Sequence, residues 1–310
     1  MRILSVLAAV AALLAQPLTA AAAPTVVKEV FAPDGTITRA RVPQPPTTPA
    51  VLATAAEVVP IQQTGPSSSR FDLVFVGDGY TAAELATFHQ HVVARWAELS
   101  AIEPYKSLKQ SFNVWQVNVV SQESGVDNDP TRGVRRNTAL DMYFWCGNIE
   151  RLLCVNETKA RQSAASAPEA DQILALANTT KYGGAGGGVA TSSGGNAQAT
   201  WIVAHELGHS IGGLADEYDY PNDLYTGSEP KEPNVSKYTS AQMTQYRVKW
   251  YAHLGKVSPD GGVVGTYEGA YYHRRGVYRP TENSLMRSLG RPFNIIGLET
   301  MRAAILSHTH

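Results

Sequence analysis

The sequence has little cysteine, little net charge and few long apolar runs. It contains 2 cysteines in 310 residues, which excludes a small fold built on several disulfides. The formal net charge is -1, so we expect no nucleic-acid partner. No apolar run beyond the N-terminus reaches the roughly 18 residues of a membrane-spanning helix, and no membrane span is predicted.

The N-terminus carries a short apolar run with a basic residue before it. Arg2 precedes the apolar residues 3–14, and small residues continue to Ala23. This pattern is typical of a secretory signal peptide, and its apolar core is too short to cross a membrane. We expect cleavage among residues 20–23, which gives a secreted or periplasmic protein that starts near Pro24.

Composition divides the remaining chain into an arm and a main domain. Residues 24–65 are predicted to be an N-terminal arm with a Pro-rich linker, and residues 66–310 the main domain. The arm contains one possible hairpin, over 26–31 and 36–42. A latency propeptide is the alternative interpretation of the arm, but it has no cysteine that could block a metal.

The main domain opens with a strand followed by a helix, which favours an α/β fold. The apolar strand Phe71–Val76 leads through a Gly-rich turn to Thr81 and Glu84, a capping box that begins a helix. Further strands are predicted near 112–120 and 172–177, and a final helix over 295–305. Cys146 and Cys154 stand eight residues apart, and in an exported protein they are predicted to form a local disulfide.

The most informative stretch is the H-E-x-x-H motif that begins at His205. On a helix, His205 and His209 lie on one face, so both imidazoles can reach one metal ion. Glu206 then lies beside that ion. Zn²⁺ binds neutral histidine nitrogens and takes four ligands, and a catalytic site leaves one of these places to water. A third protein ligand is therefore expected after the helix.

Two neighbouring carboxylates follow the helix and compete for the third position. Gly212 and Gly213 end the helix and reverse the chain. In the metzincin pattern H-E-x-x-H-x-x-G-x-x-H/D, the ligand follows the glycine by three residues, and Asp216 keeps this step after Gly213. Asp216 is the preferred ligand. Glu217 remains the alternative, and would otherwise hold an imidazole N–H.

Six sequence blocks spread over residues 71–302 resemble the IgA-peptidase family of zinc metallopeptidases. Its motif H-E-x-G-H-x-x-x-x-L-x-D-E-Y fits 205–218, and the other blocks are Asp78–Thr81, Tyr182–Gly184, Glu232–Asn234, Tyr267–Ala270 and Gly276–Pro280. The resemblance implies a metzincin-like fold with a twisted mixed sheet, a backing helix, an active-site helix and a smaller C-terminal subdomain. It also implies that 66–310 is the catalytic domain, with His205 and His209 as zinc ligands and Glu206 as the catalytic base.

Other residues are candidates for the surroundings of the metal. Met286 falls where a metzincin has the methionine that lies under its metal. The Gly-rich run 182–188 is expected to flank the cleft, where an extended substrate could lie along a strand edge. Tyr267, Tyr271 and Tyr278 are candidates for donating to the oxyanion.

The predicted function is hydrolysis of peptide bonds in a protein or peptide substrate by water that Zn²⁺ and Glu206 activate. Two alternatives stay open at this point. One is a secreted zinc hydrolase of cell-wall peptides. The other is a metal-binding or adhesive module without turnover, although binding alone does not need the carboxylate of Glu206.

Overall fold

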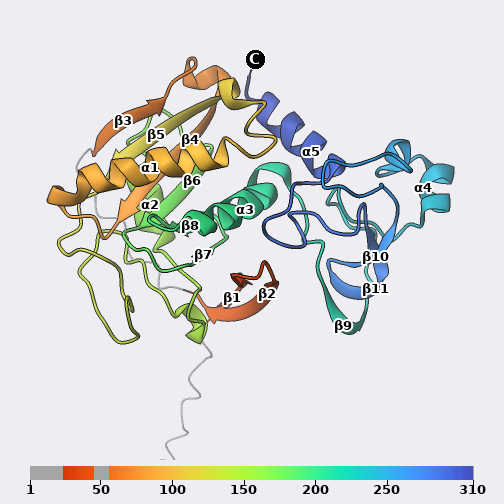
Figure 1. Ribbon diagram of the computed structural model, residues 1–310, viewed down its shortest axis with the longest axis horizontal. Coiled ribbons are helices and arrows are strands. Elements are labelled where there is room, and N and C mark those ends of the chain that lie inside the picture. Colours follow the sequence, from red (N-terminus) through yellow and green to blue (C-terminus); the bar gives the residue numbers. More distant parts are fainter. Residues whose placement is uncertain (1–23, 45–55, 310) are drawn as a thin grey trace, which may run out of the picture.

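The structure is a computed structural model that describes residues 24–44 and 56–309 (Figure 1). The expected signal peptide, residues 1–23, lies outside the described residues, as does most of the Pro-rich linker. Within the described part, no helix combines the length and apolar character needed to cross a membrane.

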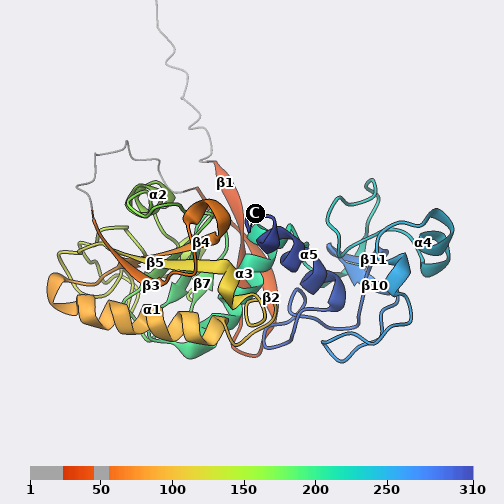
Figure 2. The same ribbon diagram turned by 90° about the horizontal axis from the view of Figure 1, so that it is seen from above.

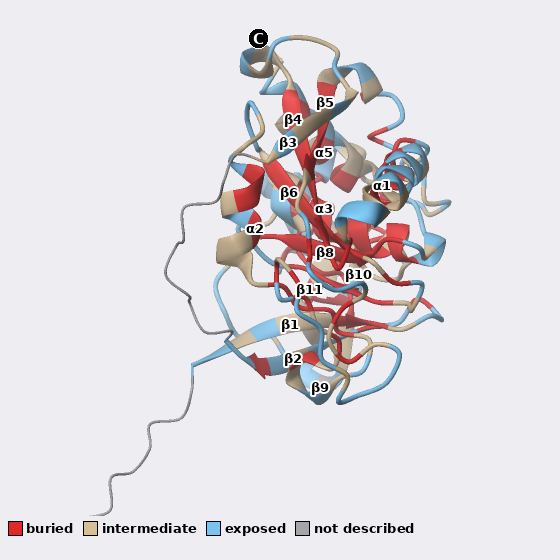
Figure 3. Ribbon diagram, turned by 90° about the vertical axis from the view of Figure 1, so that its left-hand side faces the viewer, coloured by how far each residue is buried: buried red, intermediate tan, exposed pale blue. Residues whose placement is uncertain are grey.

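A six-stranded mixed sheet forms the centre of the larger part of the molecule. Its strands follow the order β3-β5-β4-β6-β8-β7, with bounds Glu57–Gln62, Phe112–Asn118, Phe71–Asp78, Gln172–Ala177, Ala190–Ser193 and Gly184–Ala185. The inner pairs are parallel, and the edge strands β3 and β7 run antiparallel to their neighbours. Every residue of β4 and β6 is buried, as the apolar runs predict for strands covered on both faces (Figure 3).

Helices cover both faces of this sheet. α1 (Leu85–Leu99) and α3 (Thr200–Gly212) pack on one face, and α2 (Glu157–Ala164) packs on the other (Figure 2). The Thr81–Glu84 capping box precedes α1, as predicted. The prediction of a mixed α/β fold with a mixed sheet is confirmed.

A smaller C-terminal part follows α3. It contains a three-stranded sheet in the order β10-β11-β9, with bounds Tyr267–Ala270, Tyr272–Arg279 and Asp219–Leu224. The short helix α4 (Ser240–Tyr246) lies in this part, and α5 (Ile295–Leu306) packs against α3 (Figure 1). The predicted final helix, 295–305, differs from α5 by one residue.

The predicted N-terminal hairpin is present and lies between the two parts (Figures 1 and 2). β1 (Thr25–Phe31) pairs antiparallel with β2 (Ile37–Pro43). The next strand along the chain, β3, pairs with β5 in the main sheet, although the sequence placed residues 57–62 in the arm. The main sheet therefore begins before residue 65.

The predicted disulfide between Cys146 and Cys154 is confirmed. Both cysteines are buried, and they pack against Val30 and Val42 of the hairpin. The disulfide loop therefore packs on the side of the hairpin that carries Val30 and Val42.

Candidate metal centre

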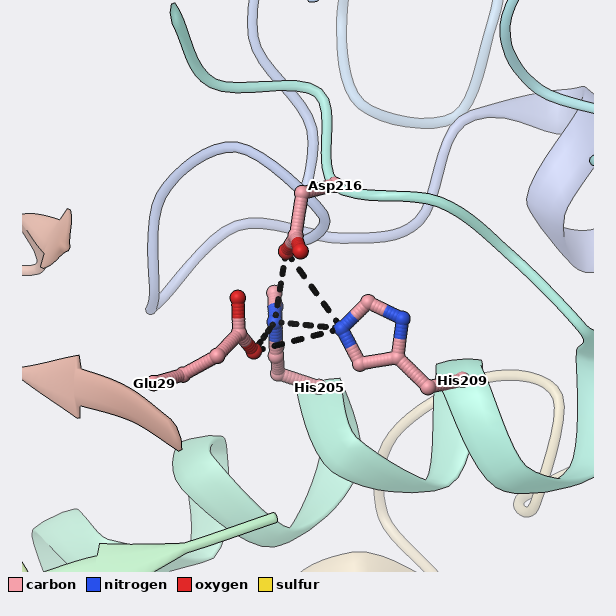
Figure 4. Close-up of side chains that lie close together, drawn as sticks. All are labelled: Glu29, His205, His209 and Asp216. Atoms are coloured by element: carbon pink, nitrogen blue, oxygen red, sulfur yellow. Dashed lines mark hydrogen bonds and ion pairs between the residues drawn. The ribbon is translucent and has the colours of Figure 1, made fainter. Parts of the chain in front are cut away.

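Helix α3 brings two histidines to one point. His205 and His209 lie one turn apart, and their Nε2 atoms are 3.0 Å from each other (Figure 4). The helix ends at Gly212 because Gly213 takes a left-handed conformation with φ 57°, which the sequence predicted from the glycine pair. The chain then turns back towards the histidines.

Backbone carbonyls fix which nitrogen of each ring faces the cluster. The Nδ1 of His205 lies 3.0 Å from the carbonyl oxygen of Leu285, and the Nδ1 of His209 lies 2.7 Å from that of Leu214. A carbonyl oxygen only accepts, so each Nδ1 carries a proton and donates. Each Nε2 is then available to a metal ion, an arrangement common around histidine ligands.

The carboxylate of Asp216 lies beside the Nε2 atoms of both histidines. Its Oδ1 lies 3.2 Å from Nε2 of His205 and 3.3 Å from Nε2 of His209. Its Oδ2 accepts a hydrogen bond from the hydroxyl of Tyr272. Oδ1 is buried and, apart from these two imidazole nitrogens, finds no partner among the residues that the structure describes. A buried carboxylate oxygen in this position is suited to a cation.

Glu217, the alternative ligand in the sequence, points away from the histidines. Its carboxylate accepts hydrogen bonds from Asn234 at 2.9 Å, Asn294 at 2.8 Å and Ser284 at 2.7 Å. These donors come from separate segments of the C-terminal part. Glu217 therefore connects these segments through hydrogen bonds. The geometry favours Asp216 as the metal ligand.

A second carboxylate, Glu29, reaches the cluster from β1 (Figure 4). Its Oε2 lies 3.0 Å from Nε2 of His205 and 3.3 Å from Nε2 of His209. Its Oε1 accepts a 2.5 Å hydrogen bond from Tyr218. Sequence reasoning missed Glu29, because a single glutamate 176 positions before the motif has no spacing that marks it as a neighbour.

The four side chains fit a tetrahedral metal ion. The ligand atoms of Glu29, His205, His209 and Asp216 all lie within 4.8 Å of one another, and five of their six separations are 3.0–3.3 Å. A tetrahedral zinc site with ligands at about 2.0 Å has ligand–ligand separations of about 3.3 Å. The mixture of imidazole and carboxylate donors also suits zinc.

Glu206 lies beside the cluster in a dry environment. Its side chain is buried, and its Oε1 has no hydrogen-bond partner in residues 24–44 or 56–309. Burial, assisted by the negative charge of Glu29, raises the pKa of Glu206 to about 7. The backbone of Gly186 passes so close that a Cβ there would overlap the Glu206 carboxylate. Glu206 is thus a buried carboxylate beside the cluster, with a raised pKa in the metal-free chain.

The neighbouring carboxylates also change the proton affinity of the histidines. Burial alone would lower the pKa of His205, but Asp216 and Glu29 raise it to about 10. Burial likewise opposes a charge on His209, and the same two carboxylates hold its pKa well above the ordinary value. In the metal-free chain, the two carboxylates therefore favour the protonated form of the histidines.

Other predicted site residues divide into near and distant groups. Met286 is buried against α3, where a Cβ on Gly208 would lie 2.7 Å from its Sδ. Tyr267 donates to the Val263 carbonyl and Tyr271 to Glu232, away from the cluster. The tyrosines that contact the cluster are Tyr218 and Tyr272.

A cavity of about 320 Å³ opens next to the cluster. Its walls come from the hairpin, the Gly-rich run, α3 and the C-terminal part, and include Lys28, Glu29, Gly186, Glu206, His209 and Tyr272. The Gly-rich run therefore borders the candidate site, where the sequence placed it.

Comparison with known proteins gives one family. The model of a family described as IgA Peptidase M64 matches residues 59–260 and 251–305, and this covers most of the chain. A search of curated proteins found no match.

Proposed function

We propose that the protein is an exported zinc-dependent endopeptidase with a metzincin-like active site. The chain belongs to the IgA peptidase M64 family, and this is the starting point of the proposal. The observation that carries the proposal is the convergence of His205, His209 and Asp216 around one point, with Glu206 buried beside it. Export is proposed from the signal-peptide pattern of residues 1–23.

Three side chains would hold the ion: His205 and His209 through Nε2, and Asp216 through Oδ1. A zinc ion bound there would supply Lewis acidity, polarising the carbonyl of the scissile bond and lowering the pKa of water to about 7. The hydrogen bonds to Leu285 and Leu214 keep the imidazoles in the required tautomer. Tyr272 orients Asp216, so that Oδ1 faces the histidines.

Glu206 would act as the general base and then as the general acid. Its buried carboxylate beside the cluster can take a proton from the attacking water and return it to the leaving amine. Its unpartnered Oε1 supports this role, because no described donor occupies the oxygen that would accept the proton. A module that only binds metal would gain nothing from a buried carboxylate of this kind, since such burial is costly.

An extended peptide is the proposed substrate. Residues 186–188 of the Gly-rich run are all glycines, so a substrate backbone can approach Glu206 and the cluster there. The run contains β7, the edge strand of the main sheet, which contacts β1 of the hairpin. An extended peptide would lie along this edge in the place of β1.

The test combines zinc content with cleavage of an unfolded protein. Four proteins are compared: wild type, Glu206→Gln, Glu29→Ala and the double variant. Glu29→Ala is included because the Glu29 carboxylate lies beside both histidine nitrogens. At saturating zinc we expect equal zinc content in all four proteins, and loss of cleavage in both Glu206→Gln proteins. Full cleavage by a zinc-loaded Glu206→Gln protein would overturn the proposal. Cleavage of cell-wall peptides but not of unfolded proteins would move the substrate class to cell-wall amides.

A further inference from the structure

The cluster contains one protein ligand too many for an open catalytic site. Catalytic zinc sites use three protein ligands and leave the fourth position to water or substrate, whereas four protein ligands are typical of closed structural sites. Here the Oε2 of Glu29 completes the tetrahedron with His205, His209 and Asp216. The three ligands on and after α3 would leave the fourth position open.

We propose that Glu29 is a fourth protein ligand of the metal in the intact chain, and that the β1–β2 hairpin is thereby an internal inhibitor of the peptidase. This inference rests on the proposed function, because inhibition presupposes a peptidase. It gives residues 24–43 a defined role: they occupy the place of the substrate until they are displaced.

Packing on both sides of the hairpin fixes the position of Glu29. Val30 and Val42 pack on the disulfide loop, whereas Phe31 and Ile37 pack in a separate apolar cluster with Ile202 of α3 and Tyr218. All four hairpin side chains are buried. The Glu29 carboxylate is therefore held beside the histidines by apolar packing on both sides of the hairpin.

The hairpin also covers the cleft beside the metal point. Lys28 donates a 2.7 Å hydrogen bond to the carbonyl oxygen of Gly186, in the Gly-rich run where a substrate backbone would approach. On the opposite side, the guanidinium of Arg39 lies 3.7 Å from the centre of the Tyr272 ring. A substrate cannot occupy this space at the same time as β1.

Contacts at the turn and on β2 join the hairpin to the C-terminal part. The amide of Leu289 donates to the carbonyl oxygen of Gly35 at 3.0 Å, and the amide of Arg39 donates to the hydroxyl of Tyr220 at 2.8 Å. The hairpin thus bridges both sides of the cleft. Its departure would free the fourth ligand position, the Gly186 carbonyl and the Tyr218 hydroxyl together.

The test uses the full chain with zinc and a small metal-binding probe, acetohydroxamate. Wild type is compared with Glu29→Ala, with the near-isosteric Glu29→Gln, and with Arg41→Ala, a control at an exposed position of β2. Because a tethered ligand competes with any free one, we expect acetohydroxamate to bind Glu29→Ala at least about tenfold more tightly than wild type. Zinc should bind Glu29→Ala more weakly, and Arg41→Ala should behave as wild type.

Two results would overturn the inference. One is equal acetohydroxamate affinity in wild type and both Glu29 variants, which would mean that Glu29 does not occupy the ligand position. The other is loss of zinc binding in Glu29→Gln while circular dichroism shows it folded, which would make Glu29 an essential ligand of a closed site. Glu29→Gln keeps the size of the side chain, so it guards against a misfolded Glu29→Ala.

Failure of the proposed function would look different. A zinc-loaded Glu29→Ala chain that binds acetohydroxamate more tightly but cleaves no peptide would support the ligand role of Glu29 and contradict the peptidase. A wild-type chain that cleaves peptides as fast as Glu29→Ala would support the peptidase and contradict the inhibitor.

Discussion

Two adjacent carboxylates, Asp216 and Glu217, have opposite surroundings. Asp216 has a buried Oδ1 that faces two imidazoles, whereas Glu217 accepts three hydrogen bonds from the C-terminal part. Burial raises the pKa of Glu217, and its three donors act against that rise. The first side chain is therefore suited to a metal and the second to holding loops.

Exchanging each carboxylate for its amide should separate these roles. We expect Asp216→Asn to weaken zinc binding at least about tenfold, because the ion loses a negative ligand. Glu217→Gln should keep zinc affinity but lower the free energy of unfolding of the metal-free chain by about 1–2 kcal/mol. The reason is that the NH₂ group of glutamine would face one of the buried donors that the carboxylate now accepts from. Zinc competition titration and urea unfolding measure the two effects. The reverse pattern would make Glu217 the ligand.

The sequence could predict the residues whose chemistry follows from local spacing. His205, Glu206 and His209 lie within one helical turn, and the glycine exit indicated that an acidic residue would return. The choice between Asp216 and Glu217 required the hydrogen bonds of Asn234, Ser284 and Asn294, which the sequence places far away. Spacing alone cannot show which of two neighbours faces inward.

Elements rather than single residues decide what can approach the metal. The hairpin could be predicted from its alternation and turn, but its docking beside α3 could not, because that depends on apolar packing across the whole chain. The same holds for β3, which lacks clear periodicity in the sequence and pairs at the edge of the main sheet. The Gly-rich run was correctly expected beside the site, and its closeness to Glu206 explains the need for glycine at 186.

Gly186→Ala tests that closeness. An added Cβ would overlap the Glu206 carboxylate, so the loop or the base must shift, and we expect cleavage to fall by about tenfold or more. Gly188→Ala is the matched control, since its Cβ would meet only the flexible ends of Arg161 and Glu157 among its nearest neighbours. Steady-state kinetics in a Glu29→Ala chain gives the comparison. Equal rates for both alanine variants would show that the run does not constrain Glu206.

The candidate ligands come from separate parts of the molecule. Glu29 lies on the hairpin, the histidines on α3, and Asp216 on the segment that leads into the C-terminal part. A bound ion would therefore join parts that otherwise meet through α3, α5 and the hairpin. Binding to the folded state alone would stabilise it by about 2.7 kcal/mol at a hundredfold excess over the dissociation constant.

Zinc binding should release protons. Asp216 and Glu29 hold the pKa values of His205 and His209 above the ordinary value, which favours protonated rings in the metal-free chain. Zinc needs neutral imidazoles, so apparent affinity should rise with pH by up to about tenfold per unit for each proton released. Calorimetry in two buffers of different ionisation enthalpy measures this release. Buffer-independent heats would contradict the protonated state.

Hydrolysis at this cluster is tested most directly by the cleavage rate of a fluorogenic peptide library. The rate is measured for zinc-loaded Glu29→Ala and for the same chain with Glu206→Gln, at equal zinc content. We expect Glu29→Ala to cleave, to stop when a chelator removes zinc and to recover when zinc returns. The added Glu206→Gln should slow cleavage by about a hundredfold or more, because the proton acceptor is lost. Equal rates in the two zinc-loaded chains, or cleavage that survives complete zinc removal, would contradict a zinc peptidase at this site.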